Sequence, residues 1–496
     1  MGSRPRFQMV VDNQFVDSLS GRWFATDNPF SGLPWADVAA GSPDDVDRAV
    51  TSAHRAFRGP DWAEMTASDR GVLLNRLADL VAAHAEELAV AEVRDNGKLL
   101  AEMRGQMAYM PRWYRYYGGL ADKVEGAVLP SDKKKMVSLT RLEPLGVVAA
   151  IVPWNSPLLL AAWKLAPALA AGNTVVVKPS EFTSTSISVF MHLVAKAGFP
   201  PGVVNVVTGS GPEVGSALVN HPLVRAVAFT GGEAAGVKIA ESAARRIVPV
   251  TLELGGKSAN IIFPDADITR AVNGVISGIF AASGQTCVAG SRLLVHSAIA
   301  EEVVSKVVEL ARLARLGDPM LAETQVGPVT TKQQLEKILA HIAAAKSAGA
   351  RCILGGSRAS SLGCGNGWFV EPTIFTDVTR HMRLAREEVF GPVLAVMEFS
   401  DEQQAISIAN DTEYGLAAGV WTRDLNQAHR VAQAVEAGSV WINTYRTSAP
   451  MAPFGGYKRS GLGREGGAAA ILQFLQAKSI WIDLGEEGPP PFVMKL

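Results

Sequence analysis

The sequence contains few of the residues that mark a secreted or metal-clustered protein. Its 496 residues include three cysteines, Cys287, Cys352 and Cys364, and none of them forms a CxxC pair. The odd count and the wide spacings argue against a disulfide framework and give no zinc-cluster pattern. Because free thiols are typical of a reducing compartment, we expect a cytoplasmic protein. Because the zinc-cluster pattern is absent, we also expect no bound metal.

The sequence also lacks an excess of charge and a long apolar run. It has 47 basic and 48 acidic residues, and its net charge is -1. This balance gives no electrostatic case for a nucleic acid or an anionic membrane as partner. No stretch approaches the roughly 18 uncharged apolar residues of a membrane span, and the N-terminus lacks the apolar core of a signal peptide. We therefore expect a globular protein that acts on small molecules.

The pattern of apolar residues predicts an α/β protein of more than one domain. Residues 42–45 (SPDD) start a helix, because Ser42 can cap it and proline suits its first turn. Further helices are predicted at about 68–96 and 99–120. Apolar runs at 146–152, 174–177, 203–208 and 226–229 then alternate with helical stretches. Continuous apolar runs indicate strands that are covered on both faces, so we predict a doubly wound parallel sheet.

A second alternating series starts at 259–263 and ends at about 442, which predicts a second α/β domain. Two segments outside both series look extended and peripheral, 124–142 and the stretch from 471 onward. The three prolines at 489–491 exclude regular helix or central strand in the tail. We therefore divide the chain into a first domain (1–123 and 143–254), a second domain (255–470), and an arm with a tail (124–142 and 471–496).

Cys287 is the first candidate for chemistry. It lies in the segment 283–290 (SGQTCVAG), where the flanking glycines let the backbone approach a ligand. Taken alone, a cysteine in such a place is more often a buried structural residue, and this is our interpretation of Cys352 and Cys364. Three further segments favour a catalytic role for Cys287 over a structural one: 153–155 (PWN), 253–258 (ELGGKS) and 387–393 (EEVFGPV).

Seven motifs occur along the chain in the order PWN, KPSE, FTG, ELGGKS, GQTC, EVFGPV and PFGGYKRSG. In this order and spacing the sequence resembles the aldehyde dehydrogenase superfamily over nearly its whole length. The resemblance implies the oxidation of an aldehyde to a carboxylic acid with NAD or NADP. It also implies that the first domain binds NAD, that the second domain carries the nucleophile, and that the arm joins subunits into a homodimer or homotetramer.

The resemblance assigns the catalytic roles as follows. The thiolate of Cys287 attacks the aldehyde to form a thiohemiacetal, and the side-chain amide of Asn155 and the N–H of Cys287 bind its oxyanion. After hydride transfer, Glu253 activates the water that cleaves the thioester. The resemblance implies a catalytic role for Lys178 as well as a role in binding the cofactor. Without the resemblance, Asn155 can equally be a helix cap and Glu253 an ordinary carboxylate at the end of a strand.

The predicted cofactor site begins with Lys178 and Glu181, which by resemblance hold the adenosine ribose. A carboxylate there repels a 2′-phosphate, so we favour NAD, with NADP as a possible alternative. A helix start after Gly231 and Gly232 favours a phosphate, and Glu233 is expected to point away from it. The full predicted set is Val152, Pro153, Trp154, Lys178, Ser180, Glu181, Gly231, Gly232, Gly236, Leu254, Gly255, Glu388 and Phe390.

The substrate side is less defined by the sequence. Ser156 stands where many relatives carry a bulky aromatic residue, and Ser448 stands where some relatives carry another. These two small residues suggest a wide pocket for a bulky or functionalised aldehyde. Arg446 either pairs with a substrate carboxylate or lies at the surface or a subunit interface. Trp163, together with Trp113 and Tyr114, is expected to line the entrance, although plain packing is an alternative for all three.

Two other functions are compatible with this scaffold. One is a CoA-acylating relative, and that class generally lacks the glutamate that acts as general base, so Glu253 argues against it. The other is a binding protein without catalytic activity. The presence of Cys287, Asn155, Glu253 and Glu388 together argues against this second alternative.

Overall fold

A sheet of eight strands forms the centre of the N-terminal body, in the order β22-β12-β11-β8-β9-β10-β2-β3. Its five central strands are parallel, and four of them lie at the predicted apolar runs. The doubly wound parallel sheet is therefore confirmed. These strands are β8 (Val147–Ile151), β9 (Thr174–Lys178), β10 (Val204–Val206), β11 (Val224–Thr230) and β12 (Val250–Glu253).

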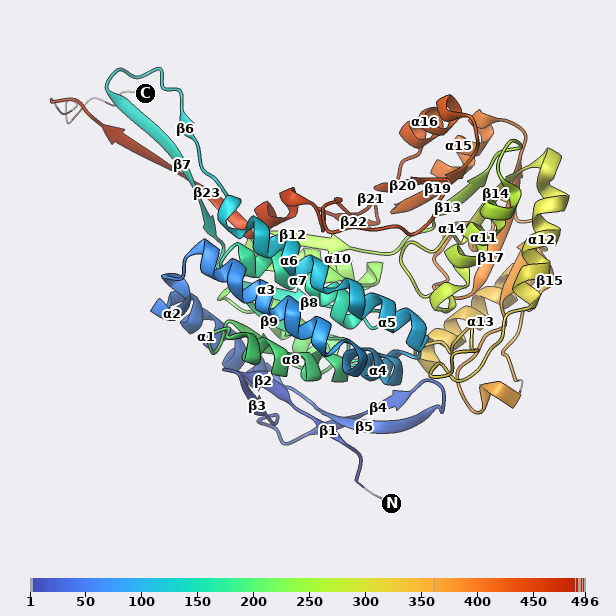
Figure 1. Cartoon of the computed structure of the whole chain (residues 1–496), viewed down its shortest axis with the longest axis horizontal. Helices are drawn as coiled ribbons and strands as arrows, with labels where there is room; N and C mark the ends of the chain where they lie inside the picture. Colours follow the sequence, from blue (N-terminus) through green and yellow to red (C-terminus); the bar gives the residue numbers. More distant parts are fainter. Residues whose placement is uncertain (1–2, 361, 487, 489–491, 493, 495–496) are drawn as a thin grey trace.

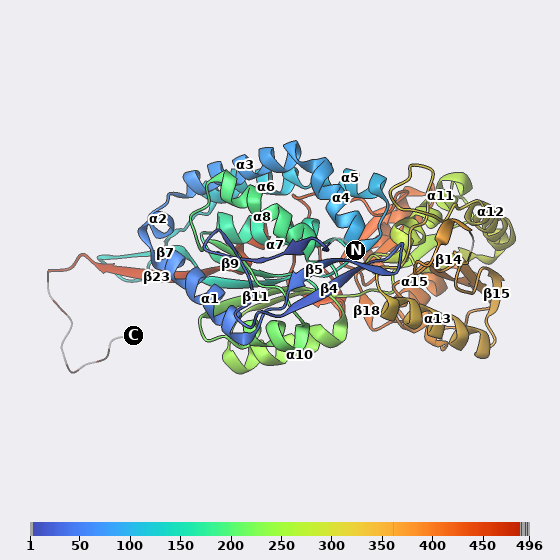
Figure 2. The ribbon, with the colours of Figure 1, turned by 90° about the horizontal axis from the view of Figure 1, so that it is seen from below.

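Helices cover both faces of this sheet because successive strand residues point to opposite sides. Val148 and Ala150 pack against the helices from α3 to α8, whereas Val147 and Ala149 pack against α1 and α9. Figure 2 shows α3, α6, α7 and α8 on one side of the strands, and α1 and α10 on the other. The helices are α1 (Pro43–Arg58), α2 (Pro60–Ala63), α3 (Ala67–Ala83), α4 (Ala85–Asn96), α5 (Leu100–Tyr109), α6 (Pro111–Leu120), α7 (Pro157–Ala170), α8 (Thr185–Ala197), α9 (Ser216–Asn220) and α10 (Glu233–Arg246).

The helix starts follow the sequence, but two predicted helices are divided. Ser42 caps α1 by accepting a hydrogen bond from the backbone N–H of Asp45 at 3.4 Å. The predicted helical stretch 68–96 is confirmed with one break, because the chain turns at His84, between α3 and α4. The predicted stretch 99–120 is likewise α5 followed by α6, which begins at Pro111, where proline suits the first turn.

The first 40 residues form strands that the sequence did not predict. Two of them, β2 and β3, extend the large sheet in antiparallel fashion, and three others form a small sheet in the order β1-β5-β4. Three of these strands have only two or three residues, too few to show an apolar period. They are β1 (Arg6–Phe7), β2 (Met9–Val11), β3 (Gln14–Val16), β4 (Trp23–Asn28) and β5 (Leu33–Ala39).

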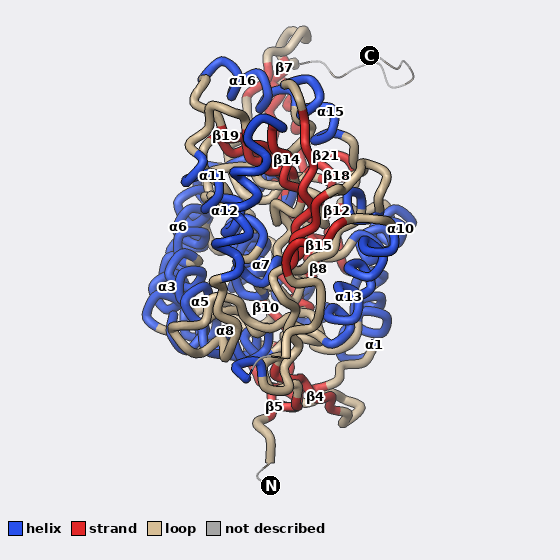
Figure 3. The backbone as a smooth tube through the Cα atoms, turned by 90° about the vertical axis from the view of Figure 1, so that its right-hand side faces the viewer, coloured by secondary structure: helices blue, strands red, loops and turns tan. Residues whose placement is uncertain are grey.

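A second sheet of seven strands, in the order β15-β16-β17-β14-β13-β19-β20, confirms the predicted second α/β series. Helices again cover both faces, and Figure 3 shows α11 and α12 on one side of the strands and α13 on the other. The strands are β13 (Ala259–Ile262), β14 (Arg292–His296), β15 (Arg351–Leu354), β16 (Thr373–Thr376), β17 (Val393–Phe399), β19 (Ala417–Trp421) and β20 (Ser439–Ile442). The helices are α11 (Ile268–Ile279), α12 (Ala300–Arg312), α13 (Lys332–Ser347), α14 (Arg383–Arg386), α15 (Glu402–Asn410) and α16 (Leu425–Ala434).

Three strands form an arm that projects from the N-terminal body (Figure 1). They are β6 (Val128–Leu129), β7 (Met136–Pro144) and β23 (Leu475–Asp483), and β23 pairs with β7 from Leu475 to Asp483. The short strand β22 (Gly461–Leu462) joins the first sheet beside β12, although it comes from the stretch assigned to the second domain. The domain boundaries stay a prediction.

This computed structural model describes residues 3–360, 362–486, 488, 492 and 494. The predicted proline break at 489–491 lies outside them. None of the described helices is both long and apolar enough to cross a membrane.

Candidate active site

A cleft of about 600 Å³ lies between the two α/β bodies, at the carboxyl ends of the first sheet's strands. Ligands bind to open parallel sheets at this end. The cleft brings together Cys287, Glu253 and Asn155, which lie far apart in the sequence. It is lined by Pro153, Trp154, Asn155, Leu160, Thr230, Gly231, Gly232, Glu253, Leu254, Gly255, Cys287, Gln334, Lys337, Glu388 and Phe390.

Cys287 follows α11 in a loop with an unusual backbone. Ala282, Ser283 and Gly284 all have positive φ angles, of 53°, 53° and 71°. Such angles are costly for residues other than glycine and persist only where the surroundings enforce them. Here Ser283 Oγ donates a hydrogen bond to the carbonyl oxygen of Gly327 at 2.7 Å, and the Gln285 side chain contacts residues 328 and 330. The loop that carries Cys287 is therefore held from several sides.

The thiol of Cys287 faces the carboxyl group of Glu253. Burial, followed by repulsion from Glu253, raises the pKa of the thiol well above 9.0. Glu253 is itself buried, and neither of its carboxyl oxygens has a hydrogen-bond partner within the described residues. Burial first, and then the charge of Glu465, raises the pKa of Glu253 well above 4.5. A carboxyl group with a raised pKa is suited to accept a proton near neutral pH.

Lys164, Glu465 and Thr230 surround Glu253, and the sequence analysis did not single them out. Lys164 is buried, forms an ion pair with Glu465 and donates to Thr230 Oγ1 at 2.5 Å. Its positive charge lowers the pKa of Glu253, in opposition to Glu465. Lys164 offered a signal in the sequence, since it is a lysine inside an otherwise apolar helix. Glu465 offered none.

Asn155 lies in the loop between β8 and α7, two residues before the helix begins. It is buried, and its side-chain Nδ2 donates a hydrogen bond to the carbonyl oxygen of Gln285 at 3.1 Å. An amide nitrogen has two N–H donors, so one remains for a ligand oxygen. Gly256 lets the strand-end loop approach the nucleophile closely, because a Cβ at that position would lie 2.9 Å from the carbonyl oxygen of Cys287.

Glu388 and Phe390 line the cleft from the second α/β body. One carboxyl oxygen of Glu388 accepts from the N–H of Gly256 at 3.0 Å, and burial raises the pKa of Glu388. A Cβ on Gly255 would lie 2.3 Å from the other oxygen of Glu388, so a larger residue at 255 would displace this carboxyl group. The ring of Phe390 stands edge-on to Trp154, with centroids 5.2 Å apart.

Lys178, Ser180 and Glu181 lie at the end of β9 and do not line this cleft. Lys178 Nζ donates to the carbonyl oxygen of Pro179 at 2.9 Å and lies 3.4 Å from Glu181 Oε2. Burial lowers the pKa of Lys178. No contact joins Lys178 to Cys287 in the described part of the chain, so its predicted catalytic role has no structural support, and its role toward a cofactor stays a prediction.

The helix start at Gly231 and Gly232 has the predicted form. Helix α10 begins at Glu233, after Gly232, and both glycines line the cleft. The carboxylate of Glu233 accepts from the hydroxyl of Tyr414 at 2.8 Å and from Arg459 Nε at 2.6 Å. It is therefore directed away from the first N–H groups of the helix, which remain available to an anion.

The predicted substrate residues fall into two groups. Ser156 is buried behind Asn155, whereas Arg446 and Ser448 lie in the loop after β20; Arg446 is half-buried and Ser448 is exposed. The carbonyl oxygen of Ser448 accepts from Tyr109 Oη at 2.8 Å. Arg446 donates to the carbonyl oxygen of Ser277 at 3.0 Å.

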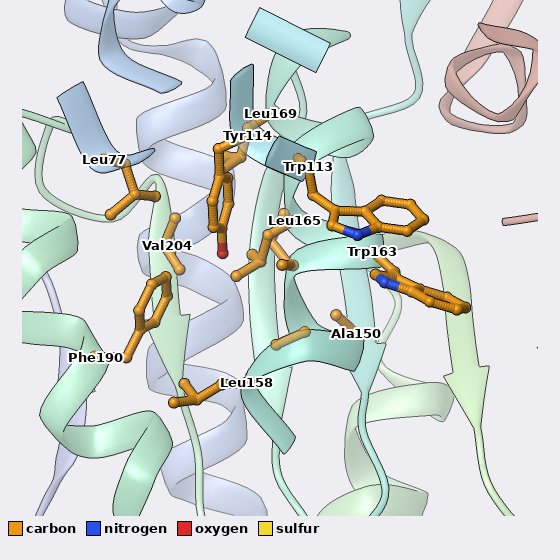
Figure 4. Packing of buried hydrophobic residues seen from close by; sticks show 14 of the residues in the cluster. Leu77, Trp113, Tyr114, Ala150, Leu158, Trp163, Leu165, Leu169, Phe190 and Val204 are labelled. Carbon is orange, nitrogen blue, oxygen red and sulfur yellow. The ribbon is translucent and has the colours of Figure 1, made fainter. Parts of the chain in front are cut away.

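The aromatic residues expected at the entrance are mostly in the core. Trp113 stacks on Trp163 with centroids 4.6 Å apart, and Trp163 in turn contacts Phe454. Tyr114 is fully buried against Phe190, as Figure 4 shows, so its placement at the entrance was wrong. The reason is that α6 turns this face toward α3 and α7. A contact of Trp163 with substrate stays a prediction.

Comparison with known proteins decides the family. The model of the "Aldehyde dehydrogenase family" matches residues 15–480. The chain belongs to the aldehyde dehydrogenase family.

Individual aldehyde dehydrogenases resemble the chain over nearly its whole length. It is 45% identical, over 99% of its length and 100% of the relative's, to (Z)-2-((N-methylformamido)methylene)-5-hydroxybutyrolactone dehydrogenase from Acinetobacter baylyi. An NAD+ complex of aldehyde dehydrogenase from Bacillus cereus superposes with a TM-score of 0.94 at 44% identity, covering 97% of each chain. Betaine aldehyde dehydrogenase from Staphylococcus aureus in complex with NAD+ gives a TM-score of 0.96 at 38% identity, covering 98% of this chain and 97% of that one.

Membership confirms the predicted enzyme class. The chain is an oxidoreductase that acts on aldehydes, and the shared α/β architecture accounts for the two sheets described above. Membership of this family therefore argues against a binding protein without catalytic activity.

Proposed function

We propose that this aldehyde dehydrogenase oxidises its substrate through a thiohemiacetal and a thioester on Cys287, with water activated by Glu253. The observation that carries the proposal is the convergence of the Cys287 thiol, the Glu253 carboxyl group and the Asn155 amide on one cleft. Glu388 and Phe390 line the same cleft, so a cofactor can lie beside the aldehyde.

The first step needs a thiolate, and the raised pKa of the Cys287 thiol means that a base must take its proton. Glu253 is in contact with the thiol, and its own raised pKa brings it nearer to that of the thiol. The thiolate then attacks the carbonyl carbon. The resulting oxyanion accepts hydrogen bonds from Asn155 Nδ2 and the Cys287 N–H, and one such donor contributes about 10²–10³ in rate.

Residues of the cleft, together with Lys178 and Glu181 at the end of β9, fit NAD. Glu388 can accept from the hydroxyls of one ribose, and Lys178 with Glu181 can hold the other. The start of α10 presents unpartnered N–H groups beside Gly231 and Gly232, which lack side chains that would block a diphosphate. Bound NAD+ supplies a hydride acceptor. The Glu181 carboxylate favours NAD over NADP, and two similar solved structures contain NAD+.

Glu253 is also placed for the hydrolytic step. Its two oxygens have no hydrogen-bond partner among the described residues, so the carboxylate is free to accept a proton from water. Water adds to the thioester carbon, the C–S bond breaks, and the Cys287 thiolate leaves with the acid as product. This position for a general base argues against the CoA-acylating alternative, which transfers the acyl group to a thiol.

We propose a functionalised rather than a simple alkyl aldehyde as substrate. Ser156 and Ser448 are small and polar, and Arg446 lies in the same loop as Ser448. The Acinetobacter relative is named for a substituted 5-hydroxybutyrolactone. Such a ring is the closed form of an aldehyde that also carries a carboxylic acid.

We also propose that the arm joins copies of this chain into a dimer or tetramer. Its strands expose large apolar side chains, with Val128 76% and Trp481 57% accessible. Exposed apolar surface of this kind marks an interaction site. Size-exclusion chromatography with light scattering tests this, and a monomer at micromolar concentration would contradict it.

The catalytic proposal is tested by rapid mixing with NAD+ and an aldehyde. Glu253→Gln is expected to give a burst of about one NADH per site, slower than in the unsubstituted enzyme because the thiol has lost its base. A much slower steady state is expected to follow, because hydrolysis of the thioester has lost the same base. Cys287→Ala is expected to bind NAD+ and form no NADH. An undiminished steady state in Glu253→Gln would contradict the assignment of Glu253 to hydrolysis.

A further inference from the structure

Lys98 is a buried cation next to the site, and the proposed mechanism leaves it unused. It lies between α4 and α5, directly after Gly97, and only 2% of the residue is exposed. Its Nζ donates a hydrogen bond to Ser156 Oγ at 2.8 Å, and Ser156 Oγ donates to the carbonyl oxygen of Asn155 at 2.7 Å. The ammonium group is thus two hydrogen bonds away from the backbone of the residue that binds the oxyanion.

The protein satisfies only part of this ammonium group. An ammonium has three N–H donors, and within the described residues Ser156 is its one acceptor. Burying a charge with unused donors costs free energy, which a ligand can recover by accepting them. Lys98 therefore has the chemistry of a binding group as well as that of a structural one.

The carboxylates around Lys98 are engaged elsewhere. Glu102 accepts from the N–H of Ala282 at 2.7 Å and from that of Leu99 at 3.4 Å. Glu92 accepts from the N–H of Leu158 at 2.7 Å, and burial raises its pKa to about 7, so much of it is neutral near that pH. In the described part of the chain, neither glutamate makes an ion pair with Lys98.

Arg446 adds a second positive charge, whose field reaches Lys98. Its neighbour Tyr445 donates to the carbonyl oxygen of Val288 at 3.1 Å, which fixes this loop beside the loop that carries Cys287. Arg446 has no ion-pair partner among the described residues and contacts only a backbone carbonyl. Burial lowers the pKa of Lys98 to about 8; Glu102 opposes this shift, and the charge of Arg446 adds to it. Lys98 still carries its charge at neutral pH.

We propose that Lys98 and Arg446 together bind a carboxylate on the substrate, so that the preferred substrates are aldehydes that carry a carboxylic acid. This inference rests on the proposed function and specifies its substrate class. A carboxylate has two oxygens that accept charge-assisted hydrogen bonds, and it neutralises the repulsion between the two cations. Asn155 lines the cleft and Ser156 follows it, so in this proposal the carboxylate approaches the ammonium group of Lys98 past Asn155.

The test compares 4-oxobutanoate with its methyl ester, which has the same aldehyde and nearly the same length without the charge. The unsubstituted enzyme is expected to have a kcat/KM at least about tenfold higher for the acid. Lys98→Met and Arg446→Met are each expected to lower kcat/KM for the acid about tenfold or more and to change that for the ester less than about threefold, because only the acid loses a charge-assisted bond. Lys98→Arg is expected to retain most of the preference.

The control is Lys337→Met, which removes a cation from the same cleft on the side of Glu388. It is expected to leave the ratio of the two kcat/KM values unchanged. Equal losses for acid and ester in Lys98→Met and Arg446→Met would overturn the inference, as would an unsubstituted enzyme that prefers the ester. Arg446 is only half-buried and lies in a loop, so Arg446→Met still tests the inference if Lys98→Met does not fold. An unsubstituted enzyme that oxidises other aldehydes but neither of these compounds would also overturn the inference, whereas one that oxidises no aldehyde with NAD+ would count against the proposed function.

Discussion

The buried pair of Lys164 and Glu465 makes a sharp prediction about stability and pH dependence together. In Lys164→Met the Glu465 carboxylate stays buried and loses its only cation among the described residues, and breaking such a pair from one side costs about 3–5 kcal/mol. The double variant Lys164→Met/Glu465→Gln removes both charges and is therefore expected to regain a part of the lost free energy of unfolding. Urea unfolding of the two variants and the unsubstituted protein at pH 7 measures the difference.

The same substitution changes the catalytic base. Lys164 lowers the pKa of Glu253, so its loss raises that pKa further. A general base acts in its deprotonated form, and therefore the ascending limb of the pH–rate profile for hydrolysis moves to higher pH. On that limb, a pKa that is higher by one makes the rate at a fixed pH about tenfold lower. The profile is measured from the steady-state rate of NADH formation, between pH 5.5 and 9.5.

The double variant separates the two effects. Glu465 raises the pKa of Glu253 and Lys164 lowers it, so removing both leaves the pKa of Glu253 closer to its original value than Lys164→Met does. The reasoning would be refuted if Lys164→Met lost less than about 1 kcal/mol of stability, the value of an exposed pair. A profile that did not move, or that moved to lower pH, would refute the electrostatic part.

Three further predictions concern other parts of the chain. Glu253→Gln is expected to raise Tm at pH 8 and to change it little at pH 4. The pKa of Glu253 is raised in the folded protein, so its carboxyl group destabilises the fold as pH rises from the unfolded pKa to the folded pKa, and glutamine does not. An equal effect at both pH values would contradict this. Gly284→Ala is expected to cost about 1–3 kcal/mol in urea unfolding, because its φ is +71° and its Cβ would lie 2.1 Å from the carbonyl oxygen of Gly391. Its control Gly105→Ala, in a helix and with open space around the Cβ, is expected to be neutral or stabilising, and equal losses would be evidence against the argument. Glu181→Ser is expected to raise KM for NAD+ and lower it for NADP+, and an unchanged ratio would exclude a role of Glu181 in this preference.

The sequence determined the local elements that depend on neighbouring residues. Apolar runs such as 174–177 became strands because a strand buried on both faces needs apolar residues at every position. The capping pattern at Ser42 placed the start of α1 for a similar local reason. The motifs around Cys287, Glu253 and Asn155 were identified by resemblance, and the residues of this cleft are the ones that the structure brings together.

Only the tertiary structure decided which side chains surround these groups. Lys164 and Glu465 are 301 residues apart, and no local pattern indicates that they pair. Lys98 sits in an ordinary loop of the sequence and becomes a buried cation only when the loop before α7 packs against the end of α4. Tyr114 shows the converse, since an aromatic residue at helical spacing looks the same whether it lines an entrance or fills a core. The charge and the exposure of a side chain depend on long-range packing, which the sequence does not display.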